Sequence, residues 1–262
     1  MASFTIKYAG GTDQGLVRKD NQDCFGKFPE DDDDLDAPGG QLFIVADGMG
    51  GHMGGQEASK LAVTTIRKCY FSERANEIPK RLEKAFIEAN QNIHRHAENH
   101  PHLYGMGTTC TALAFSATQV YVAHVGDSRA YLINKTKMQK LTEDHSQVAE
   151  MQRQGLLTEE EAQLHPHRSI LTRALGILPE VEVDIQDDIS LKAGDSFLLC
   201  TDGLAKVARA TLKDIVLSKE PKEACKRLIK LANDAGGDDN VTVQIVSVRS
   251  GEKRKGKLRF WS

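Results

Sequence analysis

The hydrophobic pattern of the chain repeats one arrangement: a short apolar run ends at an aspartate in a turn. The run Leu42 to Ala46 precedes Asp47, and similar runs precede Asp127 and Asp202. Asp239 stands just before a last run that alternates apolar and polar positions. Short apolar runs bounded by turn residues are typical of buried strands. We therefore predict several strands whose ends carry carboxylates.

Other segments have helical spacing or further strand patterning. Apolar residues recur at intervals of three and four in the ranges 58–69, 78–93, 211–218 and 222–235, which predicts helices with one buried face. Strand patterns occupy 3–10, 107–115, 119–125, 129–133, 181–189, 196–200 and 241–248. One-sided helices beside these strands are expected to lie on a sheet.

The segment from Leu141 to Gly176 differs from the rest because it is too polar for a core layer. It reads as two short helices, the second opened by a capping box of Thr158 and Glu161. We interpret it as an excursion over the surface that could act as a lid.

Composition narrows the function classes. The 262 residues are 40% hydrophobic and 27% charged, with a net charge of -3, so the overall field gives no reason to expect nucleic-acid binding. No apolar stretch has the length of a membrane span, and the N-terminus lacks a signal-peptide pattern. Five scattered cysteines without paired spacing suggest buried reduced thiols in a cytoplasmic protein.

The turn after Asp47 holds five glycines within eight residues. It lacks the Lys-Ser/Thr of a P-loop and the spacing of a dinucleotide fingerprint, so an ion is a better candidate ligand than a nucleotide. Oxygen ligands without His or Cys favour Mg²⁺ or Mn²⁺ over zinc. A carboxylate that bridges two such ions gives the two-metal geometry used for hydrolysis at phosphorus. Arg18, in a turn-rich segment, offers a planar fork for two phosphate oxygens.

Three other features keep their simpler interpretation. The acidic run 30–36 is expected to be a solvated loop, since it lacks the ligand spacing of a calcium loop. The histidines between 94 and 102 are expected to form a surface cluster, because no matching Cys/His set completes a zinc site. His124, inside a strand pattern, is expected to be a core or sheet-face residue.

Eight motifs in order resemble the metal-dependent serine/threonine protein phosphatases (the PPM, or type 2C, family) in their compact bacterial form. The resemblance covers roughly 4–248, and its motifs are GTDQGLVRKDNQD, VADGMGGHMGG, GMGTTC, HVGDSRAYL, LTEDHS, LTRALG, LLCTDGL and GGDDNVTV. It implies a four-layer αββα sandwich of two antiparallel sheets flanked by helices. It also implies one catalytic domain over 1–248, a flap at about 141–176 that helps to select substrates, and a basic tail over 249–262.

The resemblance assigns roles to individual residues. Asp47 should bridge two Mn²⁺ or Mg²⁺ ions, with the carbonyl of Gly48 as a further ligand. Asp202 and Asp239 should complete the other ion site, and Asp127 matches a residue that holds a third, weaker ion in some members. Arg18 matches the phosphate-binding arginine.

The resemblance also places Asp23 and Asn240 behind the ligands, where they orient bound water or the loop. Gln22 belongs to the same group but stands where many members have Glu, which weakens a water-mediated contact to the second ion. Met49 replaces a histidine proposed as general acid in animal members, so leaving-group protonation falls to a metal-bound water or to His52. Lys206 replaces an acidic partner of the third ion, which puts a strong third site in doubt.

The function that this implies is hydrolysis of phosphoserine and phosphothreonine in proteins by water activated at the dinuclear centre. Partners would be phosphorylated proteins, including a Ser/Thr kinase or its substrates, but not nucleic acid or membranes, and the chain would be monomeric. Two alternatives are a phosphatase of small phosphometabolites and a catalytically weak pseudophosphatase that binds partners. The second alternative predicts loss of a core ligand, yet Asp47, Asp202 and Asp239 are all present.

Overall fold

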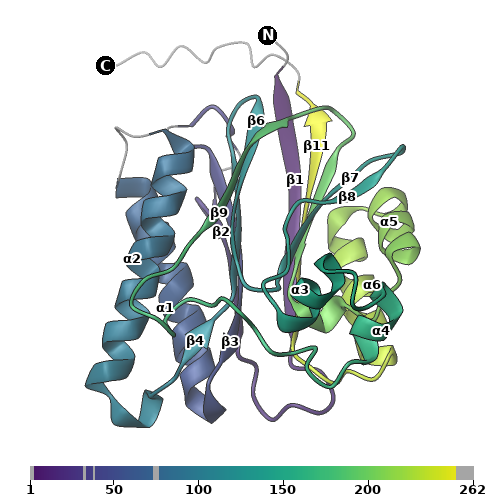
Figure 1. Cartoon of the computed structure of the whole chain (residues 1–262). Helices are drawn as coiled ribbons and strands as arrows, with labels where there is room; N and C mark the ends of the chain where they lie inside the picture. The colour runs from purple at the N-terminus through teal and green to yellow at the C-terminus, as the bar shows by residue number, and fades with distance from the viewer. Residues whose placement is uncertain (1–2, 32–33, 38, 73–76, 252–262) are drawn as a thin grey trace.

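Two antiparallel β-sheets pack face to face, and helices cover the outer face of each (Figure 1). The computed structural model describes residues 3–31, 34–37, 39–72 and 77–251. The first sheet has the order β1 (Phe4–Asp13), β11 (Val241–Ser250), β10 (Ser196–Cys200), β7 (Arg129–Ile133) and β8 (Met138–Lys140). The second has the order β2 (Asp23–Phe28), β3 (Gln41–Met49), β5 (Cys110–Phe115), β6 (Gln119–Val125) and β9 (Asp184–Ser190), with β4 (Gly107–Thr108) paired to β3.

The helices form the two outer layers. Helices α1 (Gly51–Ser72) and α2 (Ile78–Asn99) lie on the second sheet, and α5 (Arg209–Ser218) and α6 (Pro221–Asp234) lie on the first (Figure 1). The α+β sandwich that the resemblance implied is therefore confirmed. None of the described helices has the length and apolar character of a membrane span.

The central strand β3 shows why its sequence is continuously apolar. Leu42, Ile44 and Ala46 pack into the core under α1 and α2, whereas Phe43 and Val45 point into the layer between the sheets. All five side chains are fully buried. A strand covered on both faces needs apolar residues at every position, not at alternate ones.

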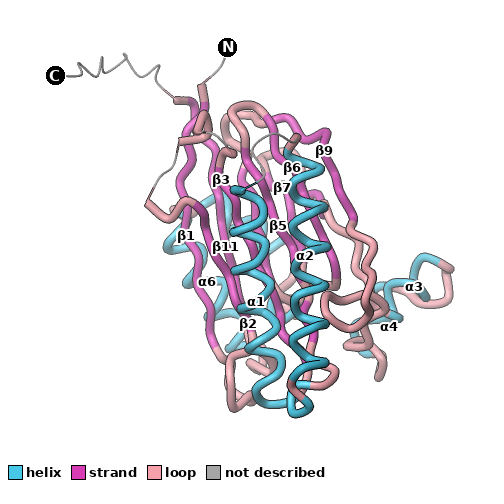
Figure 2. The backbone as a smooth tube through the Cα atoms, turned by 90° about the vertical axis from the view of Figure 1, so that its left-hand side faces the viewer, coloured by secondary structure: helices cyan, strands magenta, loops and turns pink. Residues whose placement is uncertain are grey.

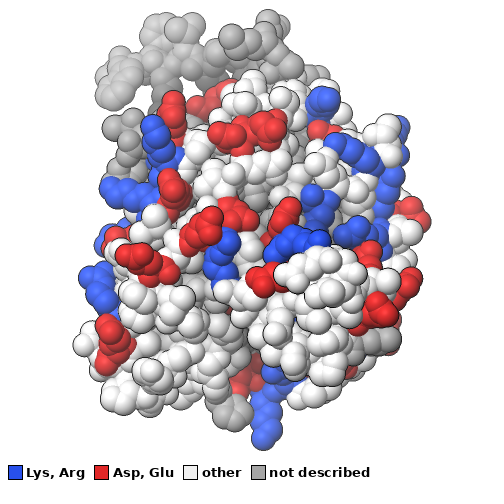
Figure 3. Space-filling model, viewed as in Figure 1, with Lys and Arg blue, Asp and Glu red and all other residues white. Residues whose placement is uncertain are grey.

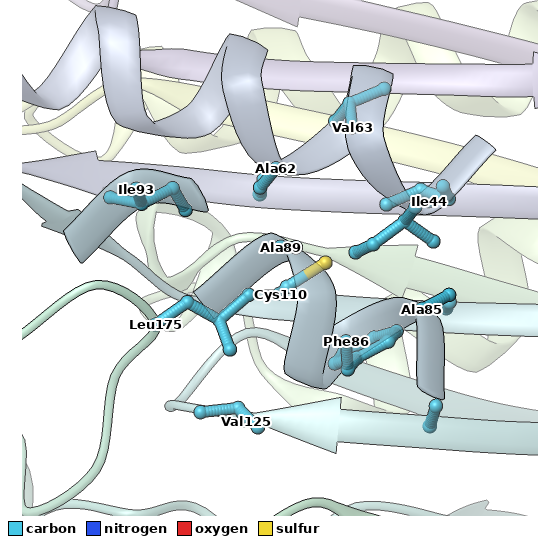
Figure 4. Packing of buried hydrophobic residues seen from close by; sticks show 14 of the residues in the cluster. Ile44, Ala62, Val63, Ala85, Phe86, Ala89, Ile93, Cys110, Val125 and Leu175 are labelled. Atoms are coloured by element: carbon cyan, nitrogen blue, oxygen red, sulfur yellow. The ribbon is translucent and has the colours of Figure 1, made fainter. Parts of the chain in front are cut away.

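Small residues let the helices approach the second sheet closely. Ala62, Ala85 and Ala89 lie in the helix–sheet core together with larger side chains such as Phe86 and Ile93 (Figure 4). Amphipathic faces of this kind carry most of the stability of a surface helix.

Strand β3 ends later in the chain than the hydrophobic pattern predicted, and helix α1 begins earlier. The pattern predicted a strand that ends at Asp47 and a helix over 58–69; instead β3 runs to Met49 and α1 begins at Gly51. A Cβ on Gly48 would lie 2.0 Å from the carbonyl oxygen of Gly55. The glycines thus let the first turns of α1 lie directly against the end of the strand.

Most of the segment 141–176 lies outside the two sheets, although Leu175 near its end is fully buried in the core under α1 and α2. It contains α3 (Gln147–Arg153) and α4 (Glu159–Leu164), which project from the edge of the molecule in Figure 2. The capping box is present, since the Thr158 hydroxyl accepts from the Glu161 amide and the Glu161 carboxylate accepts from the Thr158 amide. We call this segment the flap.

His124 and the five cysteines lie in or against the buried parts of the fold. No disulfide joins the cysteines; Cys110, Cys200 and Cys225 are buried as expected, whereas Cys24 and Cys69 are only partly buried. His124 is 1% exposed, and its ring nitrogens lie 2.8 Å from the Thr111 hydroxyl and 2.9 Å from the Glu143 carbonyl oxygen. Burial, followed by the charge of His145, lowers the pKa of His124 to about 4.

A fully buried aromatic cluster joins the two sheets, and truncating its central ring should destabilise the fold. Phe115 packs edge-to-face against Phe43 at 5.3 Å and Phe197 at 5.1 Å between centroids. We expect Phe115→Ala to lower the free energy of unfolding by about 3–5 kcal/mol, measured by urea denaturation. Tyr104→Ala, at a residue that is 87% exposed, is the control and should change it by less than about 0.5 kcal/mol. Equal effects of the two substitutions would contradict the packing described here.

The buried His124 should make stability fall in mild acid. Its pKa in the folded chain, about 4, lies below the ordinary value of 6.5, so between these pH values the unfolded chain binds a proton that the folded chain does not. From pH 7.5 to pH 5.0, the wild type should lose about 2 kcal/mol more unfolding free energy than His124→Gln. Urea denaturation with chelator measures this difference, and the exposed His102→Gln controls for loss of a histidine. Parallel pH profiles for wild type and His124→Gln would refute the assignment.

Candidate active site

Aspartates from both sheets converge at one end of the sandwich. The register of β1 on β11 runs from Phe4 opposite Ser250 to Asp13 opposite Val241, and the aspartates gather at the latter end. Asp47 lies on β3, and Asp23 faces it on β2. Asp127 follows β6, Asp202 follows β10, and Asp239 precedes β11. All the aspartates predicted as ligands therefore come together.

Crowding of these carboxylates changes their acidity. Burial, and then the charges of Asp23, Asp202, Asp127 and Asp239 in that order, hold the pKa of Asp47 well above its ordinary value. Burial and the neighbouring Asp202 raise the pKa of Asp127 to about 8, and burial raises that of Asp23 to about 7. Such a group of acids favours binding of a cation, which removes the repulsion between them.

The donor set fits Mg²⁺ or Mn²⁺. Asp202 and Asp23 each have a buried Oδ1 atom without a hydrogen-bond partner in the described part of the chain. Among those same residues, no three His, Cys, Asp or Glu side chains are arranged to hold one ion by themselves. Mg²⁺ commonly uses one or two carboxylates and completes its shell with water, so oxygen ligands shared between two ions remain a good fit.

Arg18 lies at the edge of the aspartate group. Its Nη2 donates to Oδ2 of Asp239 at 2.6 Å, and this hydrogen bond is the main reason that its pKa is raised. The Arg18 side chain is 54% exposed. Because a guanidinium has five N–H donors, the same side chain can also bind phosphoryl oxygens.

Asn240 fixes the loop that carries Arg18. Its Nδ2 donates to the carbonyl oxygens of Gln14 at 2.9 Å and Asp20 at 3.0 Å, and its Oδ1 accepts from the Gln22 amide at 2.8 Å. The side chain is 4% exposed. One amide thus ties both ends of the loop to the start of β11.

Asp23 connects the two sheets beneath the aspartate group. Its Oδ2 accepts from the hydroxyl of Thr201, at 2.9 Å, directly after β10, and from that of Thr242, at 2.6 Å, on β11 of the opposite sheet. Thr201 directly precedes Asp202, so the position of Asp202 depends on this contact. Neither threonine was predicted from the sequence, because the local pattern around each one does not indicate a hydrogen bond to a residue on another strand.

The backbone of Asp47 is held in a similar way. Its carbonyl oxygen accepts from the Thr109 amide and the Thr108 hydroxyl, both at 2.8 Å, and its amide donates to the Thr109 hydroxyl at 3.0 Å. These two threonines, also missed from sequence, fix the direction of the Asp47 side chain.

The three departures from the family pattern have local structural partners. Gln22 donates from Nε2 to the Gly51 carbonyl oxygen at 2.6 Å, a contact that a glutamate could not make. Lys206 is paired with Asp238. Met49 lies opposite Gly107 in the β3–β4 ladder. The side chain of His52, the other candidate acid, lies outside the described parts.

Arg129 was not predicted from sequence. It follows the Asp127 turn and forms a bidentate ion pair with the Asp144 carboxylate. Nε lies 3.0 Å from Oδ2 and 3.2 Å from Oδ1, and Nη2 lies 2.7 Å from Oδ2. The Arg129 charge lowers the pKa of Asp127, partly offsetting burial and the charges of Asp202 and Asp144.

A carboxylate-rich site with one arginine, at the end of a sandwich of two antiparallel sheets, defines a metal-dependent phosphate-ester hydrolase of the αββα type. Residues 21–242 match the protein phosphatase 2C family. The chain belongs to this family.

The relatives agree with this assignment. The serine/threonine phosphatase stp of Listeria innocua is 41% identical over 241 residues, which cover 90% of this chain and 93% of the relative. The crystal structure of the Mycobacterium tuberculosis serine/threonine phosphatase PstP/Ppp is similar with a TM-score of 0.83 and 36% identity, over 94% of this chain and 99% of that one. The catalytic domain of PstP in complex with two manganese ions is similar with a TM-score of 0.80 and 34% identity, over 95% and 100% of the two chains.

Removing the Asn240 clamp should loosen the Arg18 loop and weaken catalysis. We expect Asn240→Ala to lower kcat/KM on a phosphothreonine peptide by about 10–100-fold, the range found for groups that orient metal-site residues. Amide hydrogen exchange in residues 14–20 should become faster.

Asn134→Ala is the matched control for this substitution. Asn134 also accepts and donates several hydrogen bonds but lies in the β7–β8 turn, away from the aspartates. It should keep near wild-type kcat/KM. If the two alanine variants behaved alike, the clamp would have no catalytic significance.

Proposed function

We infer that the chain is a protein serine/threonine phosphatase that hydrolyses phosphoserine and phosphothreonine with water activated at a dinuclear Mn²⁺ or Mg²⁺ centre. The observation that carries the inference is the convergence of Asp47, Asp202 and Asp239 with Arg18 at one end of the sandwich. The relatives named as serine/threonine phosphatases over nearly the whole chain support the same conclusion.

Each site residue has a proposed task. Asp47 would hold two ions, the Gly48 carbonyl oxygen would add a ligand to one of them, and Asp202 and Asp239 would complete the other. Asp127 is the ligand proposed for a third, weaker ion. When bound, the ions would lower the pKa of water and neutralise charge on the phosphoryl oxygens.

The protein side chains then bind and orient the substrate. The side chains of Arg18 and Asp239 are 54% and 33% exposed, so their contact is accessible from solvent. Arg18 can therefore exchange part of this contact for two phosphoryl oxygens. Asp23, Gln22 and Asn240 hold the ligand-bearing strands and the Arg18 loop in place.

The flap is proposed to contact the phosphoprotein beside the phosphorylated residue. A cleft of about 320 Å³ lies between Glu159 of α4 and the segment after β10, and Thr201 is part of its wall. Glu159 faces Arg209 across it at 3.9 Å, an exposed ion pair that contributes little stability and can open at low cost.

Two alternatives are less well supported. A pseudophosphatase would lack a core ligand, whereas Asp47, Asp202 and Asp239 all lie in the site. A phosphatase of small phosphometabolites would favour a deep basic pocket, but Arg129 and Lys206 in this cleft are paired with Asp144 and Asp238.

We propose further that the domain spans 1–248, acts as a monomer in the cytoplasm, and takes a phosphorylated kinase or its substrates as partners. Five cysteines with no disulfide between them support a reducing compartment. Basic and acidic side chains are interspersed over the face shown in Figure 3, which does not suggest a nucleic-acid surface. The proposed basic tail lies mostly outside the described residues.

Phosphate release should depend on the metal and on Asp202. We expect release from a phosphothreonine peptide with Mn²⁺ or Mg²⁺, none with chelator, and a fall in kcat of more than about 100-fold in Asp202→Ala, since a direct ligand matters more than its supporting groups. Calorimetry should show weaker Mn²⁺ binding by this variant.

Asp214→Ala removes an exposed aspartate of α5 and should leave the rate within about twofold. Retained activity in Asp202→Ala would remove Asp202 from the centre. Hydrolysis of a small sugar phosphate in preference to the peptide would favour the metabolite alternative.

A further inference from the structure

The loop that carries Asp127 is held on one side by His145, at the base of the flap. The Gly126 amide donates to Nδ1 of the imidazole at 3.0 Å, and the His145 amide donates to the Gly126 carbonyl oxygen at 2.7 Å. Gly126 has a φ of +111°, where other residues are strained, so the loop takes this path only with glycine. The residue before Asp127 is thus bonded twice to a single flap residue.

Buried hydroxyl groups hold the loop on its other side. The Ser128 hydroxyl lies 2.7 Å from that of Thr109, and the Ser128 carbonyl oxygen accepts from the Thr111 hydroxyl at 3.0 Å. Thr109 is the residue that also bonds the Asp47 backbone. The loop is therefore fixed relative to Asp47 on the Ser128 side and relative to the flap on the Gly126 side.

The hydrogen bonds of His145 determine which nitrogen carries its proton. Nδ1 can accept from Gly126 only when it is unprotonated, so the proton lies on Nε2, which is 3.1 Å from Oδ2 of Asp184. Arg173 donates to Oδ1 of the same carboxylate at 2.6 Å and fixes its orientation. Burial and the charge of Arg173 lower the pKa of His145, which keeps the ring neutral.

We propose that His145 is a positioning residue that sets the location of Asp127 by accepting a hydrogen bond from Gly126, with Asp184 selecting the tautomer that can do so. This inference rests on the proposed role of Asp127 as an ion ligand. His145 is 5% exposed and also accepts, through its carbonyl oxygen, from the Thr172 amide at 2.9 Å. Its place at the flap base thus connects substrate recognition with one ligand of the centre.

The neighbouring His124 shows that burial of an imidazole alone does not give this arrangement. The two rings are 4.8 Å apart, but the nitrogens of His124 contact Thr111 and the Glu143 carbonyl oxygen, not the Gly126 amide. The contact to Gly126 is therefore particular to His145.

Two amide substitutions separate the positioning role from simple packing. In His145→Asn, Oδ1 can replace Nδ1 as the acceptor for Gly126, whereas in His145→Gln the amide reaches toward Asp184 and the Gly126 acceptor is lost. The full chain is titrated calorimetrically with Mn²⁺, and exchange of the Gly126 amide proton is followed by NMR. The kinetic constants are measured on a phosphothreonine peptide.

We expect His145→Asn to bind the weakest Mn²⁺ ion within about threefold of wild type and to keep slow Gly126 exchange. His145→Gln should weaken that ion by about tenfold or more, speed the exchange, and lower kcat more than it changes KM. Asp127→Ala should lose the same ion. Asp184→Ala removes the carboxylate that favours the proton on Nε2 of His145, so it should weaken binding of the same ion by a smaller factor. It provides the test if His145→Gln fails to fold.

Equal effects of His145→Asn and His145→Gln on ion binding and exchange would overturn the proposal, as would wild-type Mn²⁺ binding in Asp127→Ala. A wild type that shows the expected ion binding and exchange but releases no phosphate would instead refute the proposed function and leave the positioning role supported.

Discussion

Repulsion between carboxylates at one end of the sandwich is the constraint on which the site depends. Strand pairing places Asp23 opposite Asp47, and β10 and β11 bring Asp202 and Asp239 to the same end, so the sheet register leaves the acids no room to separate. Burial and then the charges of the neighbouring aspartates raise the pKa of Asp47, and burial and then the charge of Asp239 raise that of Asp202. The fold tolerates this because the same arrangement supplies oxygen ligands to divalent cations, and binding them stabilises the folded chain by mass action.

The groups that orient these acids are mostly neutral. Thr201 and Thr242 bond Asp23, Thr108 and Thr109 bond the backbone of Asp47, and Asn240 bonds the Arg18 loop. Hydroxyls and amides can fix a carboxylate without bringing a permanent positive charge that would compete with a metal ion. The nearby cation Arg129 is largely neutralised by its bidentate pair with Asp144, which leaves the half-exposed Arg18 as the cation best placed to meet a phosphate.

The strand-then-aspartate pattern was enough to predict that Asp47, Asp127, Asp202 and Asp239 stand at strand ends, together with most of the elements that carry them, whereas their roles as ligands came from the resemblance and stay a prediction. It could not predict the layer order, which depends on long-range pairing and came from the resemblance. The helix start at Gly51 was missed because glycine is a poor helix former, and only the close approach of Gly48 and Gly55 explains it. Residues such as Thr242 and His145 were missed because their partners lie far away in sequence and follow no period.

Two of the departures from the family pattern, Gln22 and Lys206, make the end of the sandwich less negative, because each stands where other members have an acid. Gln22 replaces an acid and uses its amide to bond Gly51, so it contributes structure without adding to the repulsion around Asp47. Lys206 replaces another acid and is paired with Asp238. This ion pair reduces the effect of the Lys206 charge on Asp127. With fewer acidic neighbours at the proposed third-ion site, the proposed role of Asp127 as a ligand depends more on where its loop is held than on the local charge. A neutral hydrogen-bond acceptor at His145 meets that requirement because it fixes the loop without altering the electrostatic balance.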